Sequence, residues 1–282
     1  RIESMNINWY PGHMTKTRRA LAEKLKLIDI VIEVLDARAP KSSLNPDVEA
    51  MFQNKEKLYV LNKTDLADEN ITNSWINYFK SEGMNCIAYS AAGGNTQKLL
   101  AAILACADPV IEKYAAKGRN KTVRAAVCGI PNVGKSAIIN RLAGNKKLKE
   151  GNKPGVTRGL AWVRLSPYLE IMDSPGLLWP KIEDEKSGAS IALIGSIRQD
   201  ILDEEELAFY LISFLTEAVP EKLMARYKLE TLSEQPWDVM EAICKSRGFL
   251  QKGGVPDTER GTRMLLDEFK NGAIGRISFE RP

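Results

Sequence analysis

The chain has 282 residues, of which 44% are apolar and 27% charged, and its formal net charge is +4. This composition is typical of a globular protein and excludes a disordered or fibrous chain. The apolar runs, such as residues 99–107, are too short to span a membrane, and the first residues lack the apolar core of a signal peptide. The four cysteines form no CxxC pair, which argues against zinc and disulfides and predicts a reducing, cytoplasmic location.

Short runs rich in valine, isoleucine and leucine predict strands, and segments with helical periodicity lie between most of them. In chain order, the predicted strands are residues 28–37, 57–62, 86–90, 124–129, 161–165 and 169–173. The predicted helices are residues 17–27, 70–81, 96–117 and 135–143. Strands that alternate with helices indicate an α/β fold with a mostly parallel sheet.

The strand signals stop after about residue 178, and the pattern from residue 189 onward is helical. We therefore expect two domains, an α/β domain over residues 1–180 and a smaller all-helical domain over residues 181–282. A polar, basic segment at residues 115–121 is predicted to be a connection within the first domain. We expect a monomer.

Charge is distributed unevenly along the chain. Residues 113–158 contain twelve Lys or Arg and one acid, whereas residues 183–206 contain eight acids and two basic residues. Most charge runs are solvated surface, and part of this basic excess serves a phosphate site. The remainder predicts a polyanionic partner, which we expect to bind the helical domain as well.

A phosphate-binding loop begins at Gly129, where the sequence GIPNVGKS fits the pattern GxxxxGK[ST] between a predicted strand and a predicted helix. Backbone N–H groups of Asn132, Val133 and Gly134 would cradle the phosphates. Lys135 is the expected catalytic cation on the β- and γ-phosphates, and Ser136 is an expected Mg²⁺ ligand.

Two partners of this loop are expected downstream. Thr157, in the sequence PGVT, is a candidate switch threonine that binds Mg²⁺ and nucleotide. The sequence Asp173-Ser-Pro-Gly176 ends a predicted strand and fits DxxG. Asp173 would hold Mg²⁺ through water, and the N–H of Gly176 would meet the γ-phosphate.

The guanine-reading motif lies upstream, where Asn62-Lys63-Thr64-Asp65 closes a predicted strand and fits NKxD. The carboxylate of Asp65 can accept hydrogen bonds from N1–H and the 2-amino group of guanine, a pair that adenine lacks. Lys63 would lie over the base. Ser90-Ala91 ends the next strand and would meet guanine O6. An ATP-dependent P-loop kinase is a competing interpretation, which Asp65 disfavours.

The motif order is the informative feature. An unpermuted GTPase reads P-loop, switch threonine, DxxG, NKxD and SA, whereas NKxD and SA come first here. A circular permutation that joins the old ends through residues 115–121 produces this order and leaves every strand in its place. The predicted fold is a circularly permuted Ras-like P-loop GTPase domain followed by an all-helical domain.

The chain resembles the circularly permuted GTPases of the YlqF/RbgA type. The resemblance rests on WYPGHM from Trp9, DARAP from Asp36, NKTD, GIPNVGKS, PGVTRG, DSPGLLWP and the helical tail. It implies a cytoplasmic GTPase that binds GTP/GDP and Mg²⁺ and acts in late assembly of the large ribosomal subunit, through the subunit precursor and its rRNA. A nucleotide-gated RNA-binding module with little catalysis is the alternative.

The source of the attacking water is open, because Leu177 stands where many GTPases have a glutamine that orients it. The permutation puts the helix at 17–27 in the place of the switch II helix, so the preceding His13 should lie near the γ-phosphate. His13 is the only histidine in the chain and the candidate catalytic residue; capping a helix or contacting the ribosome is the other possibility. The resemblance implies the catalytic role.

Asn132 occupies a P-loop position that resembles the monovalent-cation ligand of potassium-activated GTPases. The resemblance implies a K⁺ ion there, although support of the turn alone is the competing interpretation.

Overall fold

A computed structural model describes residues 12–144, 162–179, 182, 184–197 and 203–282. These residues form two compact units. The α/β unit extends to Ile182 and also takes in Ser278–Pro282, while the helical unit ends at Ile277. The sequence predicts a helical domain over all of residues 181–282. The structure differs from this prediction at the last five residues, which belong to the α/β unit.

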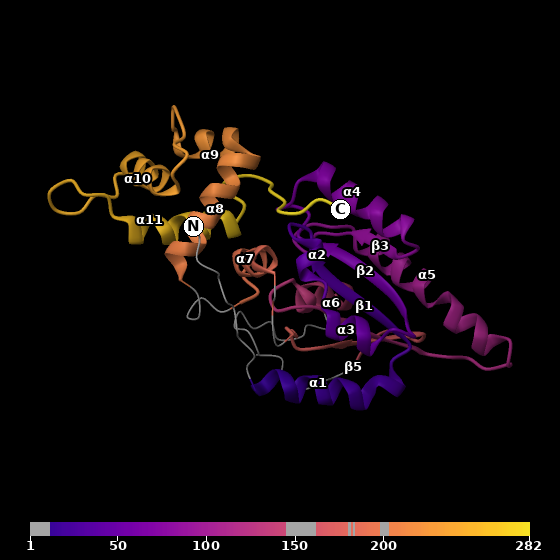
Figure 1. Ribbon diagram of the computed structural model, residues 1–282. Helices are drawn as coiled ribbons and strands as arrows, with labels where there is room; N and C mark the ends of the chain where they lie inside the picture. Colours follow the sequence, from indigo (N-terminus) through magenta and orange to yellow (C-terminus); the bar gives the residue numbers. More distant parts are fainter. Residues whose placement is uncertain (1–11, 145–161, 180–181, 183, 198–202) are drawn as a thin grey trace. The chain divides into compact units, whose positions relative to one another are not determined.

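The α/β unit is built on one six-stranded sheet with the strand order β3-β2-β1-β4-β6-β5 (Figure 1). The strands are β1 Ile30–Asp36, β2 Glu56–Asn62, β3 Asn85–Ala88, β4 Val123–Cys128, β5 Trp162–Ser166 and β6 Leu169–Asp173. All neighbours pair in parallel except β5 and β6, which are antiparallel. The predicted strands and the mostly parallel sheet are thus confirmed.

The helices of this unit are α1 Gly12–Lys24, α2 Pro40–Ser43, α3 Pro46–Met51, α4 Glu69–Ser81, α5 Thr96–Ala115 and α6 Lys135–Ala143, with a 3₁₀ turn at Leu25–Leu27. Helices α4 and α5 lie beside β3 and β2 (Figure 1). The short helices α2 and α3 were not predicted. Each begins at a proline in its first turn, a position where the missing N–H costs nothing.

The strand order explains how the motifs meet. Strand β1 is buried along its whole length, with β2 on one side and β4 on the other. Strand β4, which leads into the P-loop, lies between β1 and β6. Because β1, β2, β3, β4 and β6 run in parallel, their carboxyl ends lie at one edge of the sheet, where ligands of open α/β sheets bind.

The helical unit contains α7 Glu185–Leu193, α8 Glu204–Ala218, α9 Pro220–Tyr227, α10 Pro236–Arg247 and α11 Thr258–Lys270. Helix α8 packs against the other four helices. A buried tyrosine on α9, Tyr227, donates a hydrogen bond of 2.8 Å to Glu268 on α11, and Arg226 donates to the same carboxylate. Across the described residues, no helix combines the length and apolar character that a membrane crossing requires.

Candidate nucleotide-binding site

The P-loop connects β4 to α6 through backbone that few side chains tolerate. Asn132 has a φ of 60° and Gly134 a φ of 97°, both in the left-handed region. Asparagine and glycine are the residues that adopt this region most readily. A Cβ at Gly134 would collide with the side-chain amide of Asn62. The glycine therefore lets the end of β2, where the NKTD motif begins, approach the P-loop.

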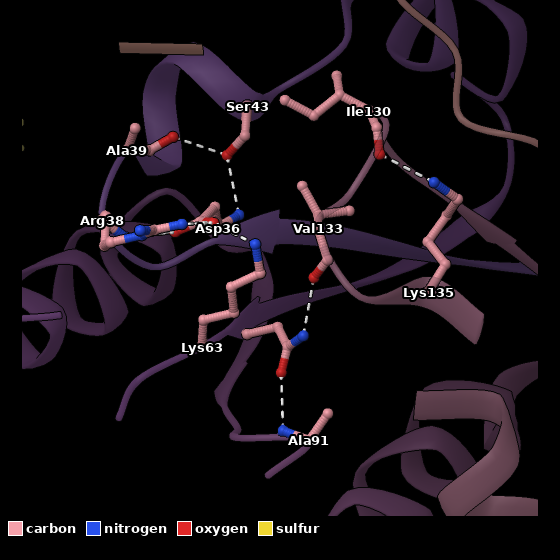
Figure 2. Close-up of polar contacts among 10 residues, drawn as sticks. Asp36, Arg38, Ala39, Ser43, Lys63, Ala91, Ile130, Val133 and Lys135 are labelled. Carbon is pink, nitrogen blue, oxygen red and sulfur yellow. Dashed lines mark hydrogen bonds and ion pairs between the residues drawn. The ribbon is translucent and has the colours of Figure 1, made fainter. Parts of the chain in front are cut away.

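Lys135 is the first residue of α6, and its side chain is buried. Its Nζ donates a hydrogen bond of 2.8 Å to the carbonyl oxygen of Ile130 (Figure 2). It donates a second one, of 3.1 Å, to the carbonyl oxygen of Gly129. Burial lowers the pKa of Lys135 to about 8, and the nearby carboxylate of Asp173 acts in the opposite direction. The lysine is thus folded over the loop, where an anionic ligand would stabilise its charged form.

Two predicted Mg²⁺ ligands meet directly. The hydroxyl of Ser136 donates a 2.7 Å hydrogen bond to Oδ2 of Asp173, and Oδ1 of Asp173 is buried without a hydrogen-bond partner among the described residues. Burial raises the pKa of Asp173, against the hydrogen bond from Ser136 and the charge of Lys135. A hydroxyl, a carboxylate and an unsatisfied oxygen are the hard donors that Mg²⁺ prefers, so these residues fit the ion.

Asn62 joins the phosphate side of the site to the guanine side. It is 1% exposed, and its Nδ2 donates to the carbonyl oxygen of Val133 in the P-loop at 2.7 Å. Its Oδ1 accepts from the N–H of Ala91 at 3.0 Å (Figure 2). One side chain therefore fixes the spacing of the P-loop, the NKTD loop and the SA loop. The predicted convergence of these three motifs is present in the structure.

The carboxylate that the sequence predicts to read guanine is oriented by a hydrogen bond. Asp65 is exposed, and its Oδ1 accepts a 2.6 Å hydrogen bond from the hydroxyl of Ser90. The same hydroxyl accepts from the N–H of Ala92 at 3.2 Å. The N–H of Thr64 donates to the carbonyl oxygen of Tyr89, which ties the two loops together. The second oxygen of Asp65 takes no part in these bonds.

The DxxG loop packs against the P-loop. A Cβ at Gly176 would lie 2.6 Å from Cα of Pro131, so only glycine fits there. Leu177 follows it, and this residue is 3% exposed and belongs to a core cluster that includes Leu21 of α1. Asn45 donates to the carbonyl oxygen of Leu177 at 2.7 Å. The leucine side chain is thus committed to the core and cannot orient water.

Two predicted site residues are not tested by the structure. Thr157 lies outside the described residues. The sequence predicts that His13 precedes a helix over residues 17–27. In the structure helix α1 begins at Gly12, so His13 lies in the first turn of the helix. The side chain of His13 is outside the described part of the structure. Leu21 of α1 belongs to the same core cluster as Leu177, so helix α1 and the residue after the DxxG motif contribute to one core.

One cluster was missed by sequence reasoning. Asp36, at the carboxyl end of β1, contacts Lys63 of the NKTD motif and Arg38. The sequence DARAP had been noted only as a family signature. Its position at the end of a predicted strand, at the same edge as the other motifs, is the signal that could have placed it in the site.

Comparisons with known proteins agree with this geometry. A family model described as 50S ribosome-binding GTPase matches residues 124–241, which include the P-loop and DxxG but not the upstream NKTD. The ribosome biogenesis GTPase A of Bacillus cereus is 43% identical over 99% of this chain and 95% of its own length. The chain belongs to the ribosome biogenesis GTPase A family.

The same family is found at greater distance. The ribosome biogenesis GTPase A of Thermotoga maritima is 33% identical over 98% of this chain and 95% of its own length. A GDP-bound structure of T. maritima YlqF, 31% identical, covers 93% of this chain and 98% of its own, with a TM-score of 0.67. A GNP-bound YlqF from the same organism has the same identity and TM-score. The circularly permuted P-loop fold and guanine-nucleotide binding follow from membership of this family.

Proposed function

We propose that this chain hydrolyses GTP while it is bound to a precursor of the large ribosomal subunit, in the cytoplasm, and that the particle stimulates hydrolysis. The observation that carries the proposal is the bridge made by Asn62, which joins the P-loop to the SA loop. A protein that only binds phosphate needs no such connection to a base-reading loop. The names of its relatives support the ribosomal setting.

The residues divide the chemistry between them. Lys135 binds the β- and γ-phosphates, while Asp65 and Lys63 bind the base. Ser136, Asp173 and Thr157 would hold Mg²⁺, which neutralises charge that develops on the phosphates. The N–H of Gly176 meets the γ-phosphate, and the chain then leads through the buried Leu177 toward the helical unit. That route would let the helical unit respond to the γ-phosphate.

Phosphate release, measured with and without large-subunit particles, tests the proposal. We expect slow release from the protein alone and faster release with the particle. Equal, negligible release in both conditions, together with GTP-dependent binding to the particle, would instead favour the nucleotide-gated RNA-binding module.

Potassium should accelerate hydrolysis relative to sodium at equal ionic strength. Asn132 is exposed and holds a left-handed backbone conformation in the P-loop, which supports a role as a cation ligand. A cation there would stabilise developing phosphate charge. We expect a rate difference of about tenfold, or about 1.4 kcal/mol in the barrier.

The matched variant for this test is Asn132→Gly, because glycine adopts a positive φ without strain and removes only the side chain. It should abolish the difference between the two salts. Equal rates in K⁺ and Na⁺ for the wild type would eliminate the cation site.

Binding to rRNA should weaken with salt, because each Lys or Arg that neutralises a phosphate releases counterions. In the basic stretch of residues 113–158, the candidates for rRNA contact outside the P-loop motif are Arg119, Lys121, Lys146, Lys147 and Lys149. Of these, Arg119 is exposed, whereas Lys121 pairs with Asp29 at 3.2 Å and lies over the ring of Tyr114. The three others lie outside the described residues.

We therefore expect Arg119→Gln to reduce the slope of log affinity against log salt by about 0.7–0.9, the value for one phosphate contact. Lys121→Gln is the control, and it should change the slope less because Asp29 already neutralises this lysine. Titration of rRNA fragments at several KCl concentrations measures both slopes. A flat salt dependence in the wild type would point to a protein partner.

The helical unit is proposed as a second ribosome-binding surface. A turn between α10 and α11 exposes Leu250 and Val255, at 50% and 56%, on either side of Lys252. Arg260 stacks over the ring of Phe249 at 4.0 Å in the same region. Basic side chains beside an aromatic ring, as in the Arg260–Phe249 pair, are a combination that surfaces binding single-stranded nucleic acid use.

A further inference from the structure

A buried carboxylate lies directly behind the guanine-reading loop. Asp36 ends β1 and is paired in the sheet with Asn62, the first residue of the NKTD motif. Its side chain is fully buried. Figure 2 shows Asp36 with Lys63 on one side and Arg38 on the other. A buried charge is costly unless its partners satisfy it, so the arrangement of these partners indicates what the charge does.

Arg38 satisfies one side of this carboxylate. Its Nε donates to Oδ1 of Asp36 and its NH2 group to Oδ2, both at 2.9 Å, so the guanidinium is bidentate. Arg38 is itself 2% exposed. Burial alone would raise the pKa of Asp36, but the charges of Lys63 and Arg38 hold it well below its usual range. Asp36 is therefore a fixed negative charge whose position does not depend on Lys63.

Lys63 supplies the second ion pair of this carboxylate. Its Nζ lies 3.0 Å from Oδ2 of Asp36, and its side chain is 23% exposed. Its backbone φ is 62°, an uncommon value for lysine. Lysine has four rotatable side-chain bonds, and ordering it costs entropy. Because Asp36 holds the ammonium at the end of the Lys63 side chain, the apolar part of this side chain is already ordered before any nucleotide binds.

We propose that Asp36 is a positioning residue for guanine recognition, and that it acts by anchoring the ammonium of Lys63 so that the lysine stem forms a pre-arranged platform for the base. The proposal rests on the guanine-binding role assigned above. Asp36 does not touch the nucleotide. Its contribution is to remove the cost of ordering Lys63 at the moment of binding, which is how pre-organisation increases affinity.

The backbone around this anchor is held by the end of the chain. The N–H of Phe279 donates to the carbonyl oxygen of Arg38 at 2.7 Å. The carboxylate of Glu280 accepts from the N–H groups of Lys41, at 2.7 Å, and Ser42, at 3.1 Å. Trp75 of α4 donates its ring N–H to the carbonyl oxygen of Glu280. The segment that follows Asp36 is thus held in place by the end of the chain.

A double-mutant cycle on GDP affinity tests the proposal, with Asp36→Asn, Lys63→Met and the double variant. Methionine keeps an apolar stem without the ammonium. Each single variant should weaken binding of a fluorescent GDP by about tenfold, which corresponds to the cost of ordering one long side chain on binding. The double variant should bind GDP as tightly as Lys63→Met, because Asp36 can act on binding only through the ammonium, which Lys63→Met has already removed. Losses that multiply to about 100-fold would overturn the proposal.

A base-selectivity measurement separates positioning from distortion of the loop. Inosine diphosphate lacks the 2-amino group but offers the same face to Lys63. Asp36→Asn should therefore weaken GDP and inosine diphosphate by the same factor. A change in the ratio of the two would mean that the variant has displaced Asp65, and the positioning role would be rejected.

Asp36→Asn leaves Arg38 buried beside a neutral amide, so the variant is also tested by thermal unfolding without nucleotide. If it fails to fold, Lys63→Met carries the test, since it leaves the Asp36–Arg38 pair intact; wild-type affinity in this variant would overturn the proposal. Wild-type preference for GDP over ADP is measured in parallel. If the wild type shows no preference for GDP over ADP, the proposed function itself is rejected. If the preference is present but the losses of the two single variants multiply in the double variant, only the anchoring role of Asp36 is rejected.

Discussion

The Asp65→Asn variant should bind GTP weakly and xanthosine triphosphate well. The carboxylate of Asp65 can accept from both N1–H and the 2-amino group of guanine, whereas an amide turns one acceptor into a donor that opposes the 2-amino group. Xanthine carries a carbonyl oxygen at that position and matches the amide. Two charge-assisted hydrogen bonds of about 1.5–3 kcal/mol each correspond to a loss of roughly 10²–10⁴-fold for GTP.

Competition between the two nucleotides for one fluorescent probe measures this exchange. Ser90→Ala is the matched control, because it removes the 2.6 Å hydrogen bond that orients Asp65 but keeps the carboxylate. We expect it to weaken GTP by about tenfold, the cost of one such bond, without a change of preferred base. If Asp65→Asn still prefers GTP over xanthosine triphosphate, Asp65 does not read the base.

Most of the nucleotide site could be predicted because its residues follow strands. NKTD follows β2, SA follows β3, the P-loop follows β4 and Asp173 ends β6. Parallel strands bring their carboxyl ends to one edge, so motifs distant in the chain had to meet there. The permuted order did not weaken this inference, since a sheet constrains where strands lie and not the order in which the chain visits them.

The parts that were missed depend on contacts rather than on local pattern. Asp36 faces Lys63 only because β1 and β2 pair in a register that sets Asp36 against Asn62. Strand β1 is buried along its whole length, so its sequence has no alternating pattern from which that register could be predicted. The return of Ser278–Pro282 rests on single hydrogen bonds, such as Trp75 to Glu280, between residues far apart in sequence. Helices α2 and α3 are too short to show a helical period.

Leu177 gives the strongest reason to look for a water-orienting group elsewhere. It is tied by backbone hydrogen bonds on both sides, its N–H donating to Gly129 and its carbonyl oxygen accepting from Asn45. Its side chain belongs to the core cluster that also contains Leu21 of α1. Rotation of this residue toward a nucleotide would break these contacts. The group that orients water must therefore come from another segment.

His13→Ala should preserve GTP binding and reduce particle-stimulated hydrolysis by about 10²–10⁴-fold, the usual contribution of a positioned general base. His13 is in the first turn of α1, eight residues before Leu21, which is about 12 Å along a helix. Leu21 belongs to the same core cluster as Leu177, the residue that follows Gly176 of the DxxG loop, and we therefore expect the start of α1 to reach the γ-phosphate side of the site. The bound particle would then fix where the imidazole points.

Single-turnover hydrolysis on large-subunit particles at saturating GTP is the measurement, with wild type, His13→Ala and His13→Gln compared at equal particle occupancy. Glutamine keeps a hydrogen-bonding group but cannot take up a proton at neutral pH. A rate for His13→Gln near that of the wild type would mean that His13 orients the water, whereas a rate near that of His13→Ala would mean that it accepts the proton. If all three proteins hydrolyse GTP equally fast, the attacking water must be oriented by the particle or by another residue, because Leu177 is held in the core.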